Sequence, residues 1–90
     1  MKRNPDYLLR SVAQSKVVVP VGKAAEIFPG MVNLNETGAF LWQLLECEQT
    51  AQSLAAALAA EYQVTQEQAL KDVGAFLENL ERVGALKGTV

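Results

Sequence analysis

The stretch that decides the fold lies at residues 32–42 and reads VNLNETGAFLW. Residues 31–34 are expected to form a short strand. Asn35 follows as a good helix N-cap, because its side chain can accept a hydrogen bond from an unpaired backbone N–H. Glu36 then lies in the first helical turn, where the helix dipole favours an acidic side chain. The stretch therefore predicts a strand that passes directly into a helix.

Two further strands are expected before this point. Residues 7–13 are a strand-length apolar run, and residues 16–21 are rich in β-branched side chains, with a turn at residues 14–15 between them. Pro20 has no N–H to donate to a ladder, so its position is expected at an edge, a bulge or a strand end. The Pro-Gly pair at residues 29–30 is a turn signal that separates these strands from the third.

Two helices are expected directly after the third strand. Leu41, Leu44 and Leu45 form the i, i+3, i+4 stripe of a helix that is expected to end near Glu46. The second helix begins after Thr50 as its N-cap and continues for about eleven residues. Its many alanines are strong helix formers and allow close packing.

The third helix has signals at both ends. Residues 65–68 read TQEQ and predict a capping box, with Val64 and Ala69 placed as a hydrophobic staple. Gly84 lies where a left-handed C-terminal cap belongs. Residues 85–90 are expected to form a short tail.

Strands followed by helices predict an α+β fold: a small three-stranded antiparallel sheet followed by three helices, similar to a winged helix-turn-helix. The chain has 90 residues, of which 50 % are hydrophobic and 20 % charged, so residues 1–90 are expected to form one globular domain. We expect the largest apolar side chains of the helices to form the core: Leu41, Trp42, Leu44, Leu45, Leu54, Leu58, Val73, Leu77 and Leu80.

Several classes of function are excluded by what the sequence lacks. It has no histidine and one cysteine, so we expect no catalytic residues, no metal site and no cofactor. Cys47 lies between Glu46 and Glu48, whose charges disfavour a reactive thiolate, so it is expected to be a spare thiol in a loop. The longest apolar runs are far shorter than the ~20 residues that cross a bilayer, and no signal-peptide core follows the basic N-terminus. We therefore expect a cytoplasmic protein with no membrane partner.

Four carboxylates of the third helix have the spacing of possible acid-base pairs: Glu67, Asp72, Glu78 and Glu81. They lie among other polar residues, and no motif places them around a substrate. A solvated helix face explains them better than a catalytic pair.

Four aromatic residues and one glycine allow two interpretations each. Phe40, Trp42, Tyr62 and Phe76 could stack on a ligand, but at helical spacing beside leucines they favour the core. Gly74 interrupts the third helix and should cost ~1 kcal/mol relative to alanine. Either a bound chain or a neighbouring backbone approaches closely there, or the helix packs tightly or simply tolerates the glycine as a defect.

Charge opposes a role in binding DNA, which the similarity to a winged helix suggests. Residues 35–83 hold two cations against eight carboxylates, a net charge of −6. Affinity for a polyanion comes largely from Lys and Arg contacts to phosphate. Residues 1–34 carry +3, which suits at most a minor contact. We therefore expect no nucleic acid partner.

The segment Asn35-Glu36-Thr37-Gly38-Ala39, followed by an aliphatic residue and Trp42, resembles the signature of one family. This is the pyrroloquinoline quinone synthesis protein D family (PqqD-like), and the resemblance extends over about residues 7–87. It implies a module of three strands and three helices that is not an enzyme. Such a module binds the leader of a ribosomally made precursor peptide and presents it to a modifying enzyme, often a radical S-adenosylmethionine protein.

The resemblance also implies where the leader binds: as an added strand beside the third strand, in a groove closed by the third helix. An edge strand offers unpaired N–H and C=O groups for such pairing. The protein is expected to be a monomer or a weak homodimer, and the alternative function is a winged-helix transcription regulator or another protein-interaction module. We expect ten residues to bind the peptide: Met31, Val32, Asn33, Leu34, Asp72, Val73, Phe76, Asn79, Leu80 and Val83.

Overall fold

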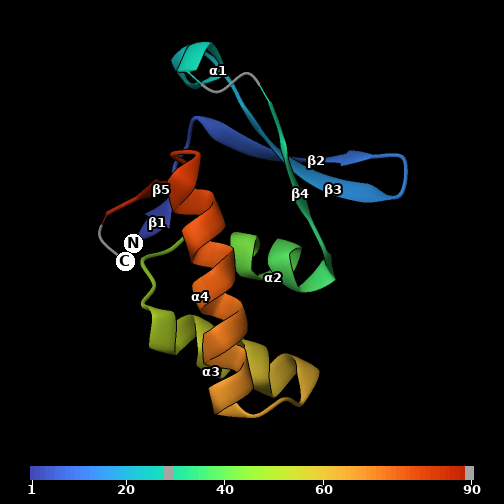
Figure 1. The fold of residues 1–90 in the computed structure, drawn as a ribbon, viewed down its shortest axis with the longest axis vertical. Coiled ribbons are helices and arrows are strands. Elements are labelled where there is room, and N and C mark those ends of the chain that lie inside the picture. Colours follow the sequence, from blue (N-terminus) through green and yellow to red (C-terminus); the bar gives the residue numbers. More distant parts are fainter. Residues whose placement is uncertain (28–29, 89–90) are drawn as a thin grey trace.

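The computed structural model describes residues 1–27 and 30–88. Figure 1 shows a three-stranded sheet at one end of the molecule and the helices α3 and α4 extending to the other. The α+β architecture expected from the sequence is confirmed. The elements in chain order are β1 (Lys2–Arg3), β2 (Tyr7–Val12), β3 (Ser15–Pro20), α1 (Lys23–Ile27), β4 (Val32–Leu34), α2 (Glu36–Leu44), α3 (Ala51–Tyr62), α4 (Gln66–Arg82) and β5 (Leu86–Lys87).

The sheet has the order β2-β3-β4, and both neighbouring pairs are antiparallel. The turn between β2 and β3 consists of Ala13, whose φ is 56°, and Gln14. The turn expected at residues 14–15 is therefore one residue too late, because Ser15 already pairs with Val12. Pro20 is the last residue of β3, which agrees with its missing N–H.

The third strand is one residue shorter than expected. β4 begins at Val32, so Met31 lies just before it. Of the turn expected at residues 29–30, Pro29 lies outside the described residues.

The pairing of β2 with β3 fixes the direction of each backbone group in the sheet. The N–H of Val21 donates to the carbonyl of Asp6 at 2.8 Å, so these two residues continue the ladder. In an antiparallel ladder, hydrogen-bonded pairs recur at every second residue. Val17 therefore directs its N–H and C=O groups toward β2, and Val18 directs its groups toward β4.

The same alternation continues into β4. Val32 pairs with Val18 and Leu34 pairs with Lys16, so Val32 and Leu34 use their backbone groups to bond β3. Asn33, between them, directs its N–H and C=O groups to the open edge of the sheet.

Side-chain caps start all three long helices. Asn35 accepts from the N–H of Gly38 at 2.8 Å at the start of α2. Thr50 caps α3 in a complete capping box with Ser53. Thr65 caps α4, as expected from the sequence. Each cap satisfies a donor that the first helical turn leaves unpaired.

The capping box expected at residues 65–68 is only half formed. Thr65 accepts from the N–H of Gln68 at 3.1 Å, but the side chain of Gln68 donates to Asp72 at 3.0 Å. Of the expected staple pair, Ala69 is buried and Val64 is exposed.

The last turn of α4 ends in a Schellman motif. Gly84 has φ of 82°, its N–H donates to Glu81, and the N–H of Ala85 donates to Leu80. The cap expected at Gly84 is therefore confirmed. The tail expected at residues 85–90 is wrong in part, because Leu86–Lys87 forms β5.

Three short elements are absent from the sequence-based prediction. β5 pairs antiparallel with β1, as Figure 1 shows near the two chain ends. β1 and β5 are two of these elements, and the third is the helix α1, which is five residues long. α2 also ends at Leu44, two residues before the expected end.

The core lies between α2, α3, α4 and the inner face of the sheet. Of the nine side chains expected there, eight are at most 2 % exposed, and Trp42 is the largest of them. Leu44 is the exception, since it is half-buried and packs against the edge of the core. The sequence did not predict that Val18 and Tyr7 are buried as well.

Tyr7 connects β2 to the end of α4. Its hydroxyl donates to the carbonyl of Val83, and the residue is 4 % exposed. Burial, and to a lesser degree the neighbouring Asp6 carboxylate, raises the pKa of Tyr7 above its ordinary value of 10.0.

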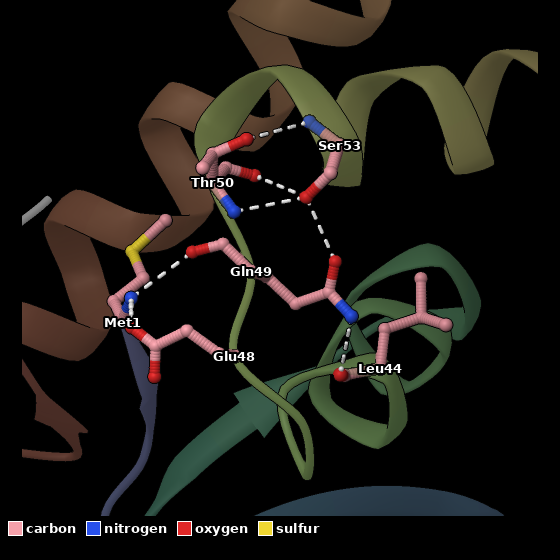
Figure 2. A network of polar contacts seen from close by, with 6 residues as sticks. All are labelled: Met1, Leu44, Glu48, Gln49, Thr50 and Ser53. Atoms are coloured by element: carbon pink, nitrogen blue, oxygen red, sulfur yellow. Dashed lines mark hydrogen bonds and ion pairs between the residues drawn. The ribbon is translucent and has the colours of Figure 1, made fainter.

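A polar network joins the chain start to the loop before α3 (Figure 2). The Met1 amine donates to the Glu48 carboxylate at 2.5 Å and to the Gln49 carbonyl at 3.0 Å. The Gln49 side chain donates to the Leu44 carbonyl and accepts from Ser53 in the capping box of α3. These bonds fix the loop between α2 and α3.

Within residues 1–27 and 30–88, no helix is long and apolar enough to cross a membrane. The same part of the chain contains no group of three or more His, Cys, Asp or Glu side chains placed to hold a metal ion.

Candidate functional site

A groove of about 480 Å³ lies between the open edge of β4 and one flank of α4. We call it the β4 groove. The start of α2 closes its floor, because α2 follows β4 after one residue. Its walls are formed by Val32, Asn33, Leu34, Asn35, Thr37, Gly38, Leu41, Asp72, Ala75, Phe76, Asn79 and Leu80.

The strand side of the β4 groove provides main-chain groups. Asn33 directs its N–H and C=O groups away from β3, whereas Val32 and Leu34 hold the strand to the sheet. An edge strand of this kind can pair with another extended chain.

The helix side provides side chains at helical spacing. Asp72, Phe76 and Asn79 lie on one flank of α4, beside the buried stripe of Val73 and Leu77. Phe76 is half-buried, so part of its ring packs on the core and part is accessible. The flank therefore offers one aromatic surface between two polar side chains.

The floor depends on a close approach between β4 and α2. A Cβ atom at Gly38 would lie 3.2 Å from the Asn35 Oδ1 atom and 3.4 Å from the Leu34 side chain. Asn35 Oδ1 also accepts from the Thr37 hydroxyl at 2.9 Å. The absence of a side chain at Gly38 lets the helix start directly under the strand.

Among the described residues that line the β4 groove, Asp72 carries the only ionisable side chain. Its carboxylate accepts from the Gln68 side chain at 3.0 Å and is exposed. The groove is otherwise neutral and partly apolar. This combination suits the binding of an extended chain and contains no nucleophile paired with a base.

Seven of the ten expected site residues line the β4 groove: Val32, Asn33, Leu34, Asp72, Phe76, Asn79 and Leu80. The other three do not. Val73 is fully buried in the core, and the Val83 carbonyl accepts from Tyr7. Met31 is 55 % exposed and precedes the strand.

Five lining residues were missed by reasoning from the sequence: Asn35, Thr37, Gly38, Leu41 and Ala75. Four of them belong to the start of α2 or its cap. Their only sequence signal is the compact motif at residues 35–39, which marks the turn from strand to helix.

The other candidate residues lie away from the groove. Cys47 is exposed in the loop after α2, as expected. Gly74 is exposed, and a Cβ atom there would meet nothing within 4 Å, so tight packing within the domain does not explain it. Glu78 lies 3.6 Å from Arg82 in an exposed ion pair, which agrees with a solvated helix face.

The aromatic residues divide between core and surface. Trp42 is buried, as expected. Phe40 and Tyr62 are half-buried and pack edge to face, with ring centroids 5.6 Å apart. Phe76 alone of the four lines the β4 groove.

A family model described as coenzyme PQQ synthesis protein D (PqqD) matches residues 16–86. The chain belongs to this family. Among curated protein sequences, none matches the chain significantly.

Two solved structures have the same fold as this PqqD family member. One is TbiB1 in complex with the TbiA(beta) leader peptide, with a TM-score of 0.78 and 22 % identity over 100 % of this chain and 99 % of that one. The other is lasso peptide synthetase B1 complexed with the leader peptide, with a TM-score of 0.74 and 21 % identity over 97 % of this chain and 96 % of that one. Both similarities extend over nearly the whole of each chain.

Proposed function

We propose that this protein binds the leader segment of a ribosomally synthesised precursor peptide in the β4 groove. The observation that carries the proposal is the position of the groove between an open strand edge and an exposed flank of α4. Membership of the PqqD family and a fold shared with two leader-peptide complexes support it.

The leader pairs with β4 as an added strand. Asn33 supplies the outward N–H and C=O groups, so the main chain provides part of the affinity. Alternate side chains of an added strand point to the same face, and one set meets Phe76 and Asn79 on the α4 side. Ordering a flexible leader costs several kcal/mol of the interaction free energy, so we expect the net affinity for the leader to be moderate.

The protein itself acts without catalysis in this proposal. It holds the leader and presents the remainder of the precursor to a modifying enzyme, for which a radical S-adenosylmethionine protein is our first candidate. Supporting this role, the described residues that line the β4 groove include one carboxylate and no nucleophile hydrogen-bonded to a base.

The test is a titration of isotope-labelled protein with the leader of its cognate precursor peptide, followed by amide chemical shifts. Shifts centred on Val32 to Leu34 and on the Asp72 flank of α4 are the expected result. Shifts confined to α3, or no binding at all, would overturn the proposal.

Two variants locate the binding surface. Phe76→Ala should weaken binding by removing the aromatic wall of the groove. Asp72→Lys should change the leader affinity, because Asp72 is the one ionisable residue among the described residues of the groove. Glu81→Lys is the control, since it makes the same change of charge on the opposite flank of α4. If Glu81→Lys changed leader affinity as much as Asp72→Lys, net charge rather than the groove would explain the effect.

A further inference from the structure

A second groove, of about 690 Å³, lies along the other open edge of the sheet. We call it the β2 groove. It is bounded by β2, by the basic strand β1 and by the last turn of α2. Nothing in the proposed leader-binding function uses this surface.

The β2 edge has outward main-chain groups of its own. Leu8 and Arg10 are opposite Val19 and Val17 and bond β3, so Leu9 directs its N–H and C=O groups away from the sheet. An extended segment can therefore pair with β2 as it can with β4.

The charge of the β2 groove is opposite to that of the β4 groove. Lys2, Arg3 and Arg10 line it, against the single carboxylate of Glu46. The part of the chain that the structure describes contributes Asp72 and no cation to the β4 groove. A segment that carries carboxylates is attracted electrostatically to the β2 groove and has no such attraction to the β4 groove.

Arg3 is held in position before any ligand arrives. Its guanidinium donates through Nη1 to the Trp42 carbonyl at 3.3 Å and lies 5.7 Å from the centroid of the Trp42 ring. Trp42 itself is buried and fixed by the core. A guanidinium already oriented in this way loses little conformational freedom when its remaining N–H groups bind a carboxylate.

We propose that the β2 groove binds an extended acidic segment of a protein partner, as an added strand whose carboxylates meet Arg3, Arg10 and Lys2. A phosphate backbone would satisfy the same cations, but the outward backbone groups of Leu9 match a peptide chain. The partner is distinct from the leader because the two grooves lie on opposite edges of the sheet. The proposal therefore stands whether or not the β4 groove binds a leader.

The test titrates the full chain at low salt with the capped peptide Glu-Val-Glu-Val-Glu-Val, and the capped peptide Lys-Val-Lys-Val-Lys-Val is the control. Amide shifts are expected at Leu9, Arg10 and Arg3 and at the Trp42 indole, with none at Asn33. Binding should weaken as the ionic strength rises, because the contacts are partly exposed. Equal shifts with both peptides, or shifts at Asn33, would overturn the proposal.

Charge reversal at the rim of the β2 groove makes the test specific. Arg10→Glu should weaken binding of the acidic peptide about tenfold, equivalent to ~1.4 kcal/mol. Lys23→Glu makes the same change of net charge on α1, outside the groove, and should have little effect. Both residues are exposed, and thermal melting checks that each variant is folded.

Lys2→Glu repeats the charge reversal on β1 and should weaken binding in the same direction. Two results would contradict the proposal: equal loss in the Lys23→Glu and Arg10→Glu variants, or tighter binding of a ten-nucleotide oligothymidine than of the acidic peptide. The second result would assign the groove to nucleic acid.

Discussion

The two edge strands of the sheet differ in length, in the charge around them and in what packs beside them. β4 has three residues and borders a nearly neutral groove walled by α4. β2 has six residues and borders a basic groove walled by the end of α2. The same backbone geometry, an open edge beside a helix, thus becomes two different surfaces through the side chains around it. Strand pairing alone is not selective, so the flanking helix and the local charge decide what binds at each edge.

The largest effect is expected within β4 itself. Val32→Pro removes an N–H that bonds β3, so we expect a loss of about 3 kcal/mol in the free energy of unfolding. Asn33→Pro removes an N–H that points to the open edge, so the fold should lose less than about 1 kcal/mol while leader binding is lost. Urea denaturation and leader titration measure the two effects.

Ser11→Pro is the matched change on β2, where residue 11 also directs its N–H outward. It should leave leader affinity unchanged. Equal loss of leader affinity in the Ser11→Pro and Asn33→Pro variants would contradict the distinction between the two edges.

Tyr7→Phe tests how the β2 edge is tied to α4. The variant leaves the Val83 carbonyl without its donor, and we expect a loss of about 1–2 kcal/mol. The pKa of Tyr7 is raised in the folded state, so the contribution of its neutral hydroxyl is complete below pH 10.0 and is lost as the pH rises through the folded pKa.

Thermal unfolding between neutral pH and pH 11 measures this difference. The stability of the wild type should fall toward that of the Tyr7→Phe variant as the pH rises. Parallel curves for the two proteins would show that the pKa of Tyr7 is the same in the folded and unfolded states, which contradicts this account. Because the pKa of Tyr62 is raised as well, only the difference between the curves reports Tyr7.

The smallest effect is expected from Gly74→Ala on the flank of α4 that faces away from the β4 groove. A Cβ atom there meets nothing within 4 Å, so the variant should be more stable by about 0.5–1 kcal/mol. Leader affinity should not change. A drop in leader affinity would show that the peptide extends over this flank, and the melting temperature reports the stability.

The sequence predicts most of the fold because its signals are local. Asn35, Thr50 and Thr65 are N-caps, as their side chains suggest. Gly84, which has no side chain, is the left-handed residue that follows the C-cap of α4. The two-residue strands β1 and β5 escape prediction, since they are too short for any periodicity and their pairing joins opposite ends of the chain.

The residues that line the β4 groove are predicted less completely, because part of the groove depends on contacts between elements rather than on local sequence. Asp72, Phe76 and Asn79 share a flank that helical spacing reveals. Gly38 and Leu41 enter the groove only because α2 packs beneath β4, and that contact depends on the tertiary fold. Val73 was also expected at the site, but it belongs to the buried stripe of α4, next to the flank that lines the groove.

Hydrogen exchange of individual backbone amides, measured with and without the leader peptide, tests the central claim most directly. The amide of Val32 bonds β3 already, and the amide of Asn33 points to the open edge. We predict that the leader slows exchange at Asn33 and leaves Ser11, on the other edge, unchanged. Slower exchange at Ser11 without any change at Asn33 would contradict the assignment of the leader to the β4 groove.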